Sequence, residues 1–112
     1  MNFIRKTKDF HEIFDVRKRI YGNLFSINYK RYLLYPHLRV GVIAGKKVGN
    51  AVKRNKIKRR VKSYFRENKE LWNYPLGLIV IARQPAAFSD WAVFKTELGK
   101  LTQKILKNEN FQ

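Results

Sequence analysis

The sequence contains no cysteine, which excludes disulfide bonds, thiolate metal ligands and a cysteine nucleophile. It also lacks a long hydrophobic segment, because its longest apolar run covers only residues 76–82 and a membrane-spanning helix needs about 20 apolar residues. No hydrophobic stretch follows the basic residues near the N-terminus, as it would in a secretory signal. The few prolines and glycines are scattered, without repeats or a linker. We therefore expect one domain over residues 1–112 and a cytoplasmic location.

Acidic residues are scarce as well. The chain has 25 lysines and arginines against 8 aspartates and glutamates, which gives a formal net charge of +17. None of the acids lies between residues 16 and 66, a stretch that holds 16 of the 25 basic residues. Solubility needs only a modest net charge, and a charge this large destabilises a small domain by self-repulsion. The composition therefore indicates a polyanionic partner and leaves DNA, RNA and acidic surfaces open.

Enough apolar material is present for a folded core, since 45% of the residues are hydrophobic and 14% are aromatic. The hydrophobic periodicity predicts three helices and three strands. These are a helix capped by Thr7 with Arg17–Arg19 near its C-terminal end, a half-buried strand Leu24–Tyr32, a strand Leu38–Ala44, a helix from Ala51 to about Asn68 capped by Asn50, a buried strand Leu78–Ala82, and a helix capped by Ser89 whose buried face begins with Trp91.

This order of elements predicts the fold class. We expect an α+β protein (an α/β sandwich) with the order α-β-β-(β)-α-β-α and helices packed on a small mixed sheet. The connection from Leu38–Ala44 through a helix to Leu78–Ala82 is long enough to join two parallel strands.

The helix predicted over residues 51–68 has two contrasting sides. Projected at 100° per residue, its apolar side consists of Ile57, Val61, Tyr64 and Phe65. The opposite side is cationic and polar, with Asn55, Lys58, Arg59, Lys62 and Arg66, while Lys53, Arg54, Lys56 and Arg60 lie on the flanks. A helix of this kind packs by its apolar side and presents positive charge to a partner.

Candidates for a catalytic centre in the protein itself are weak. Only two histidines occur, His11 and His37, and they lie far apart in the sequence. Asp9, Glu12 and Asp15 are spaced so that two carboxylates could share a metal ion, but such side chains are more often solvated or complement a helix dipole. We therefore predict no catalytic residue and no metal site in the protein, which is expected to bind nucleic acid.

Residues 45–66 read GKKVGNAVKRNKIKRRVKSYFR. The run Arg54-Asn55-Lys56-Ile57-Lys58-Arg59 resembles the RNR signature of the bacterial ribonuclease P protein subunit, and residues 46–52 resemble the loop that leads into the family's signature helix. Residues 8–14, 39–41 and 79–87 are similar to further segments of that family, in the same order. Two positions depart from its pattern: Gly45 stands where serine is common, and Asn28 stands where tyrosine is frequent, with Tyr29 next to it.

The resemblance implies a subunit that binds a large catalytic RNA, ribonuclease P RNA, in a complex that removes the 5′ leader of precursor tRNA. The RNA would carry the catalytic core and the Mg²⁺ ions, and neither DNA nor a membrane is an expected partner. The resemblance also implies a left-handed β-α-β crossover, although such crossovers are almost always right-handed.

The resemblance implies site residues on the signature helix and in the loop before it. The expected contacts with the catalytic RNA are Lys46, Lys47, Lys53, Arg54, Asn55, Lys58, Arg59, Arg60, Lys62 and Arg66. The helical projection leaves a second role open for Arg54 and Arg60, because a side chain on the flank can position the helix instead.

A second expected surface is a cleft for the leader. Phe10 and Phe14 match aromatic residues of that cleft, and aromatic faces stack on unpaired bases of any sequence. The alternative is that both rings belong to the core. Either Asn28 or Tyr29 would face the leader, and a shift of one residue along a strand exchanges them.

Two other functions remain as alternatives. A general RNA-binding structural protein, such as a small ribosomal protein, would share the charge but would have no use for phenylalanines in a cleft. A basic amphipathic protein at anionic membranes would expose its apolar helix face to lipid, whereas here that face is needed to cover the sheet.

Overall fold

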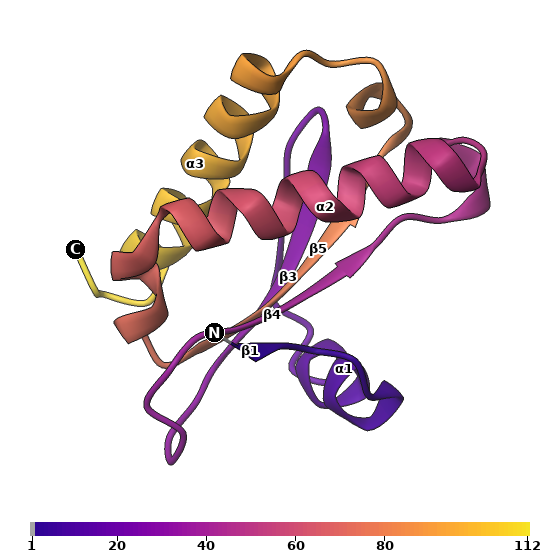
Figure 1. Cartoon of the computed structure of the whole chain (residues 1–112). Coiled ribbons are helices and arrows are strands. Elements are labelled where there is room, and N and C mark those ends of the chain that lie inside the picture. The colour runs from indigo at the N-terminus through magenta and orange to yellow at the C-terminus, as the bar shows by residue number, and fades with distance from the viewer. Residues whose placement is uncertain (1) are drawn as a thin grey trace.

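The computed structural model describes residues 2–112. Within these residues it contains three α-helices and five strands, joined in part by short 3₁₀ helices (Figure 1). In chain order they are β1 (Asn2–Phe3), α1 (Thr7–Phe14), β2 (Arg19–Tyr21), β3 (Phe25–Arg31), β4 (Arg39–Ile43), η1 (Lys46–Val48), α2 (Ala51–Glu67), η2 (Lys69–Asn73), β5 (Leu76–Ala82), η3 (Gln84–Ala87) and α3 (Trp91–Asn108). None of the helices in this part of the chain is both long and apolar enough to cross a membrane.

The strands form one mixed sheet in the order β1-β4-β5-β3-β2. The central strand β5 pairs in parallel with β4, where Val42 is opposite Val80, and antiparallel with β3, where Ile27 is opposite Val80. The predicted α+β class, the parallel pair and the central position of the 78–82 segment are therefore confirmed. The short strands β1 and β2 at the two edges were not predicted as separate elements, because two or three residues carry no readable periodicity.

The crossover from β4 through α2 to β5 is left-handed. With α2 in front of the sheet and both strands pointing upward and to the right, β5 lies on the left of β4 (Figure 1). This is the uncommon hand for such a unit. The hand implied by the family resemblance is thus confirmed.

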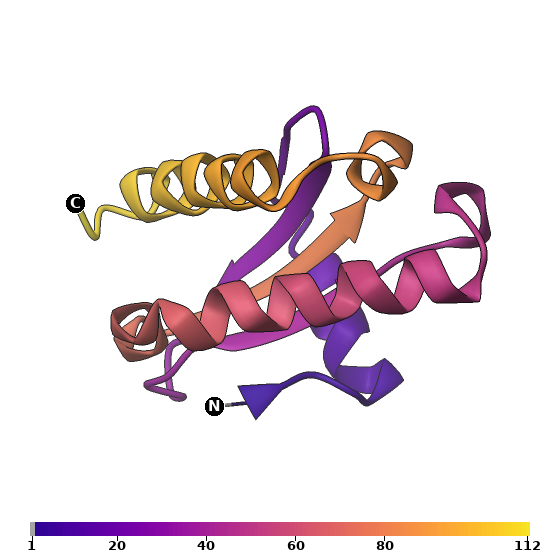
Figure 2. The ribbon, with the colours of Figure 1, turned by 45° about the horizontal axis from the view of Figure 1, so that its top comes forward.

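Helices cover both faces of the sheet. The helices α2 and α3 lie on one face, where the larger core cluster includes Phe65, Phe94 and Val80. The helix α1 covers part of the other face, where Ile13 and Ile79 are fully buried (Figure 2). Because both faces are covered, β5 reads as a continuous apolar run.

Because helices cover both faces of the sheet, one prediction about β3 was wrong. The strand β3 was expected to be half-buried, but all five residues from Phe25 to Tyr29 are buried. The polar side of its alternation, Ser26 and Asn28, faces the α1 side of the sheet, as shown by the pairing of Asn28 with Ile79. Alternation of apolar and polar residues in this strand therefore marks two different buried surfaces and no solvent-facing side.

The end of the first helix was also predicted wrongly. The helix α1 stops at Phe14, and Arg17 adopts a left-handed conformation with φ of 62°, which turns the chain into β2 at Arg19. The residues Arg17–Arg19 therefore do not stand at a helix C-terminus. Positive charge at these positions is compatible with the end of a helix and with the start of a strand, so the sequence did not distinguish the two.

The predicted helix caps were right in one case out of three. Asn50 caps α2, and its side chain accepts a hydrogen bond from the amide of Lys53 at 3.0 Å. The cap of α1 is Lys6 and not Thr7, and the cap of α3 is Asp90, whose carboxylate accepts from the amide of Val93 at 2.8 Å, and not Ser89. Both errors are shifts of one residue between neighbouring polar side chains.

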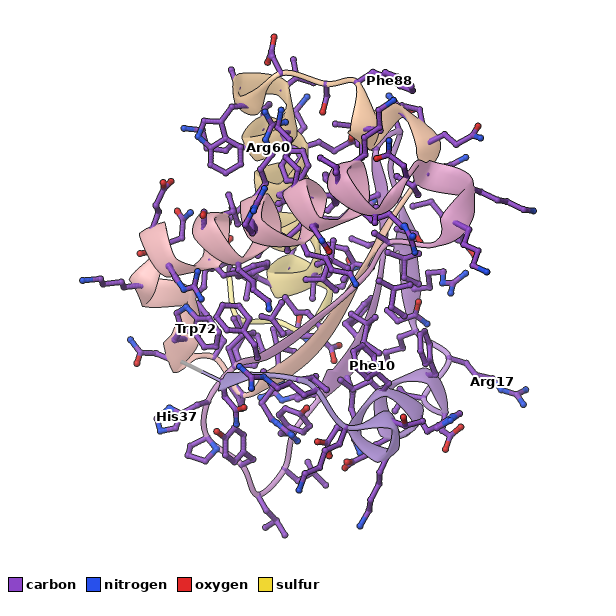
Figure 3. The ribbon with its side chains drawn as sticks, turned by 45° about the vertical axis from the view of Figure 1, so that its right-hand side comes forward. Phe10, Arg17, His37, Arg60, Trp72 and Phe88 are labelled. Atoms are coloured by element: carbon purple, nitrogen blue, oxygen red, sulfur yellow. The ribbon has the colours of Figure 1, made fainter. Side chains whose placement is uncertain are left out.

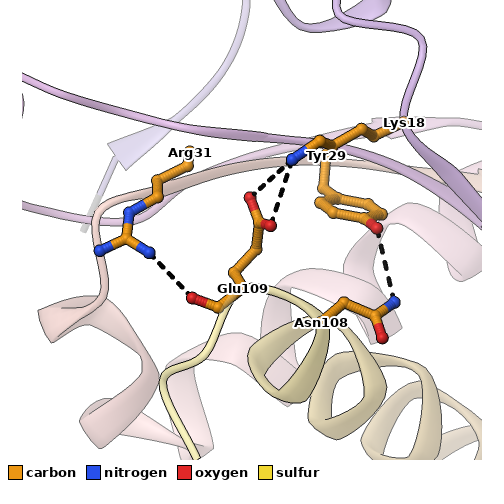
Figure 4. A network of polar contacts seen from close by, with 5 residues as sticks. All are labelled: Lys18, Tyr29, Arg31, Asn108 and Glu109. Atoms are coloured by element: carbon orange, nitrogen blue, oxygen red, sulfur yellow. Dashed lines mark hydrogen bonds and ion pairs between the residues drawn. The ribbon is translucent and has the colours of Figure 1, made fainter.

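A polar network attaches the end of α3 to the β2–β3 edge of the sheet (Figure 4). The buried carboxylate of Glu109 binds the Lys18 ammonium, with both oxygens at 3.2 Å, and the Glu109 carbonyl accepts from the Arg31 guanidinium at 2.8 Å. The Asn108 amide donates to the Tyr29 hydroxyl at 3.5 Å. The Arg31 guanidinium also lies 4.4 Å from the ring centre of Phe111. Residues 108–111 therefore hold α3 against the sheet.

Candidate nucleic-acid interface

The helix α2 presents the charged surface. It is anchored by its apolar side, on which Ile57, Val61, Tyr64 and Phe65 are all buried. The opposite side is exposed or half-exposed, and we call it the α2 ridge: Asn55, Lys58, Arg59, Lys62 and Arg66. The structure thus brings these five predicted residues together on one continuous surface of a rigid element.

The cations of the α2 ridge have no carboxylate partners among residues 2–112. In this part of the chain, ion pairs occupy three basic side chains, Lys18, Lys30 and Arg39, all of which lie outside α2. An unpaired cation on a helix surface is available to an external anion without first breaking an internal pair. The electrostatic consequence is a field of one sign along the helix.

Two flanking arginines of α2, Arg54 and Arg60, are half-buried, as are Lys58 and Lys62 of the ridge. Arg60 donates to the Ser89 carbonyl at 3.0 Å, and its guanidinium lies 5.8 Å from the ring centre of Trp91 and 5.6 Å from that of Phe94. Arg54 is half-buried, and its Nε is buried without a hydrogen-bond partner in residues 2–112. The position of Arg60 fits the alternative role of holding α2 against the start of α3.

The loop before α2 continues the positive surface. Lys46 and Lys47 are exposed in η1, and the Gln84 side chain donates to the Lys47 carbonyl at 3.0 Å, which ties η1 to η3. Lys53, in the first turn of α2, lies 4.8 Å from the ring centre of the exposed Phe88. Three predicted cations therefore surround the N-terminal end of α2, where the helix dipole also favours an anion.

At the other end of the ridge, Lys62 and Arg66 lie above the ring of Phe3, at 5.5 Å and 5.1 Å from its centre. Phe3 belongs to the edge strand β1 and packs edge-on against Trp72 at 5.3 Å. The first strand thus supports the end of the ridge. Nothing in the sequence pattern indicated this contact.

The other side of the sheet carries the predicted cleft residues. Phe10 and Phe14 project from α1, are half-buried and pack against Ile79 and its neighbours on the sheet (Figure 3 labels Phe10). Both rings therefore belong partly to the core and partly to the surface. Phe10 fits closely over Gly41, since a Cβ at that position would lie 2.6 Å from the ring.

Asn28 lies on the same face of the sheet as these two rings. Its side-chain oxygen accepts a hydrogen bond from the Nε of Arg19 at 2.6 Å, so a cation stands beside it on the neighbouring strand β2. Arg19 in turn lies 5.7 Å from the ring centre of Tyr21, which is 67% exposed. Neither Arg19 nor Tyr21 was predicted as a site residue, because Arg19 was expected near the end of a helix and no strand was expected over residues 19–21.

Tyr29, the other residue expected in the cleft, does not lie on the face of the sheet that carries Phe10 and Phe14. It is buried on the opposite face of the sheet, in the larger core cluster, where its hydroxyl accepts from Asn108 and Lys18 lies 6.0 Å from its ring centre. The pairing register fixes this orientation, because Tyr29 is opposite Leu78 and Asn28 is opposite Ile79. Of the two alternatives, only Asn28 shares a surface with Phe10 and Phe14.

Most of the acidic side chains serve the fold. The Asp9 carboxylate binds Arg39 at 2.9 Å, Glu12 binds Lys30 at 3.1 Å, and Glu97 accepts from the amides of Asn23 and Leu24 at 2.6 and 2.7 Å. No group of three histidines, aspartates or glutamates in residues 2–112 is arranged to hold a metal ion.

The contact of Asp9 with Arg39 connects α1 to the sheet beside a buried tyrosine. Burial raises the pKa of the Tyr32 phenol above its ordinary value. Desolvation acts to lower the pKa of Arg39, but the neighbouring Tyr32 and Asp9 outweigh this effect and raise it. Arg39 therefore stays charged and holds the first helix in place.

The geometry defines a class of protein: a mixed α+β fold with a cationic helix on one side of the sheet and an aromatic surface on the other. The model of the Ribonuclease P family matches residues 1–106. The ribonuclease P protein component of Syntrophus aciditrophicus is 35% identical over 106 residues, which are 94% of this chain and 87% of that protein.

Solved structures agree. The RNase P protein of Staphylococcus aureus matches with a TM-score of 0.86 and 30% identity, over 94% of this chain and 95% of that one. The RNase P protein of Thermotoga maritima matches with a TM-score of 0.82 and 26% identity, over 93% and 97% of the two chains. The chain belongs to the ribonuclease P protein family, whose members are subunits of an endoribonuclease complex that processes tRNA.

Proposed function

We propose that this protein binds ribonuclease P RNA through α2 and η1, and the 5′ leader of precursor tRNA through the surface around α1. The complex removes the leader in a Mg²⁺-dependent cleavage and leaves the mature 5′ end of the tRNA. The RNA supplies the catalytic groups and binds most of the Mg²⁺, and the protein holds both RNAs. The cytoplasm is the compartment in which this reaction takes place.

One observation carries the proposal: the basic side chains of α2 are unpaired while the acidic side chains are largely engaged elsewhere. Lys58, Arg59 and Lys62 lie on a rigid helix, and no carboxylate of residues 2–112 is bound to them. Such a surface neutralises phosphates and releases the counterions of an RNA, which provides most of the binding free energy at low salt. The match of residues 1–106 to the family identifies which RNA to test.

The arrangement of the two surfaces supports simultaneous binding of two RNAs. The α2 ridge lies on one side of the sheet and Phe10, Phe14 and Asn28 lie on the other. A half-buried phenylalanine offers its exposed edge and face to an unpaired base without regard to sequence. This property suits leaders, which differ from one precursor to another.

The test is reconstitution with a bacterial ribonuclease P RNA and a precursor tRNA at a Mg²⁺ concentration too low for the RNA to work alone. We expect the protein to restore cleavage at the mature 5′ end, and the protein without RNA to cut nothing. If adding protein gives no more accurate cleavage than the RNA alone, the proposal is wrong. In a parallel reaction, an unrelated basic protein, such as a small ribosomal protein, is added as a control. It measures how much cleavage positive charge alone restores.

The leader surface is tested separately with Phe14→Ala. The reconstituted complex should lose affinity for precursor tRNA by about 5- to 100-fold, since stacking on one aromatic ring contributes about 1–3 kcal/mol per base. Its affinity for mature tRNA, which has no leader, should stay the same. A thermal melt by circular dichroism checks that the variant is folded. Equal losses for both tRNAs would place Phe14 in the core alone.

A further inference from the structure

Two aromatic side chains beside the cationic side of α2 reach the surface, and one of them, Trp91, also packs against the larger core cluster. Phe88 follows η3 and is 76% exposed, and Trp91 begins α3 and is half-buried, although the sequence pattern had assigned it to the buried face (Figure 3 labels Phe88). We call these two residues the aromatic edge. An exposed phenylalanine and a partly exposed tryptophan on one short segment form an apolar surface within a strongly charged region.

Cations and rings alternate along this edge. The Lys53 ammonium lies 4.8 Å from the ring centre of Phe88, and the Lys95 ammonium lies 5.1 Å from that of Trp91. Arg60 also lies against Trp91 and is fixed by its hydrogen bond to the Ser89 carbonyl. The indole is therefore held in one orientation by the protein, while the two lysines have no carboxylate partner in residues 2–112 and can move to a ligand.

A hollow of about 470 Å³ opens between Trp91 and α2. Three cations and one carboxylate line it, together with a hydroxyl and the indole: Lys56, Arg59, Arg60, Glu67, Ser63 and Trp91. The indole N–H of Trp91 donates to no acceptor in residues 2–112, whereas that of Trp72 donates to the Phe65 carbonyl at 2.7 Å. The hollow thus combines an aromatic surface, a free donor and an excess of positive charge.

We propose that the aromatic edge binds unpaired nucleotides of the RNA held by α2. A base stacks on Trp91, a neighbouring base contacts Phe88, and their phosphates lie against Lys56, Arg59 and Lys95. Stacking platforms flanked by cations are how proteins hold single-stranded RNA without reading its sequence. The inference rests on the proposed function, and it adds a stacking site at the junction of η3 and α3 to the phosphate contacts of the ridge.

The test measures the affinity of the full chain for a bacterial ribonuclease P RNA as a function of salt concentration. Trp91→Leu should raise the Kd by between about 5-fold and about 100-fold, as expected for the loss of one stacked base, and should leave the salt slope unchanged. Trp91→Phe keeps an aromatic face and should restore much of the affinity. Phe88 is exposed, so Phe88→Ser should leave the fold intact. It should lower the affinity for the RNA less than Trp91→Leu does.

A matched control is Leu34→Ala, which removes an apolar side chain that is 98% exposed in the loop between β3 and β4. It should bind the RNA as the wild type does. Acrylamide quenching of tryptophan fluorescence gives a second readout, because bound RNA should shield Trp91 while Trp72 is already buried.

The outcomes separate this inference from the function on which it rests. If the wild type binds the RNA and both Trp91→Leu and Phe88→Ser bind equally well, the aromatic edge is not a binding site. If Trp91→Leu weakens binding and also flattens the salt slope, the tryptophan acts only by placing Arg60, and the inference is again wrong. If the wild type itself does not bind the RNA, the proposed function fails and the inference fails with it.

Discussion

The contact between Gly41 and Phe10 allows a sharp test of how α1 sits on the sheet. An alanine Cβ at position 41 would lie 2.6 Å from Cε1 and 2.9 Å from Cζ of Phe10, so the ring must move. Overpacking typically costs about 1–3 kcal/mol, and we expect about 1–2 kcal/mol because the half-buried ring can shift toward solvent. Alanine in a strand gains about 0.5–1 kcal/mol over glycine. The net expectation is a loss of about 0.5–1 kcal/mol in the free energy of unfolding.

The sign of this effect should reverse when the ring is absent. In a Phe10→Ala background the added methyl has space, so Gly41→Ala should stabilise the protein by about 0.5–1 kcal/mol. The measurement is a double-mutant cycle from urea unfolding followed by far-UV circular dichroism. The matched control is Gly45→Ala, since a Cβ there meets nothing within 4 Å. Equal effects of Gly41→Ala in the two backgrounds would refute the reasoning.

Three further predictions concern charge and burial. Arg59→Gln should lower the slope of log K against log salt for binding to ribonuclease P RNA by about 0.7–0.9, one phosphate contact, and an unchanged slope would remove Arg59 from the interface. Glu109→Gln removes the negative charge that pairs with Lys18 and should lower the free energy of unfolding by about 1 kcal/mol in urea, whereas Gln in place of the exposed Glu70 should have no measurable effect. Burial raises the pKa of the Tyr64 phenol in the folded protein. The unfolded chain therefore loses the phenol proton at a lower pH than the folded protein does, and the free energy of unfolding should fall above about pH 10. Tyr64→Phe should reduce this fall, and a pH series of thermal melts would show no difference if the phenol does not titrate differently in the two states.

The large elements were predictable because their signals are long. The helix α2 has 17 residues, and four apolar positions share one side of it. The strand β5 is an apolar run that begins directly after Pro75 and ends before the segment 83–88. The parallel pairing of β4 with β5 followed from the length of the connection. The edge strands gave no such signal, and Arg17–Arg19 reads equally well as the end of a helix or the start of a strand.

The sequence predicted which residues make up the candidate site, but it did not predict where every side chain points. The projection of α2 gave the correct exposed side, since a helix fixes the direction of each side chain. For Asn28 and Tyr29 the local pattern leaves two registers, and only the pairing with Ile79 and Leu78 decides between them. The support of Lys62 and Arg66 by Phe3 involves residues about sixty positions apart, which no local pattern encodes.

The strand order has a consequence for how the chain folds. The strand β5 follows all other strands in the sequence but lies at the centre of the sheet, between β4 and β3. Without it the sheet consists of two separate pieces, β1 with β4 and β2 with β3. During synthesis these pieces have no common neighbour until residues 76–82 have left the ribosome, so a local β2–β3 hairpin can form early while the complete sheet cannot. The nascent protein therefore exposes its cationic helix before it has a finished sheet to support it, and the entry of β5 joins the two pieces into one sheet, which α3 then covers.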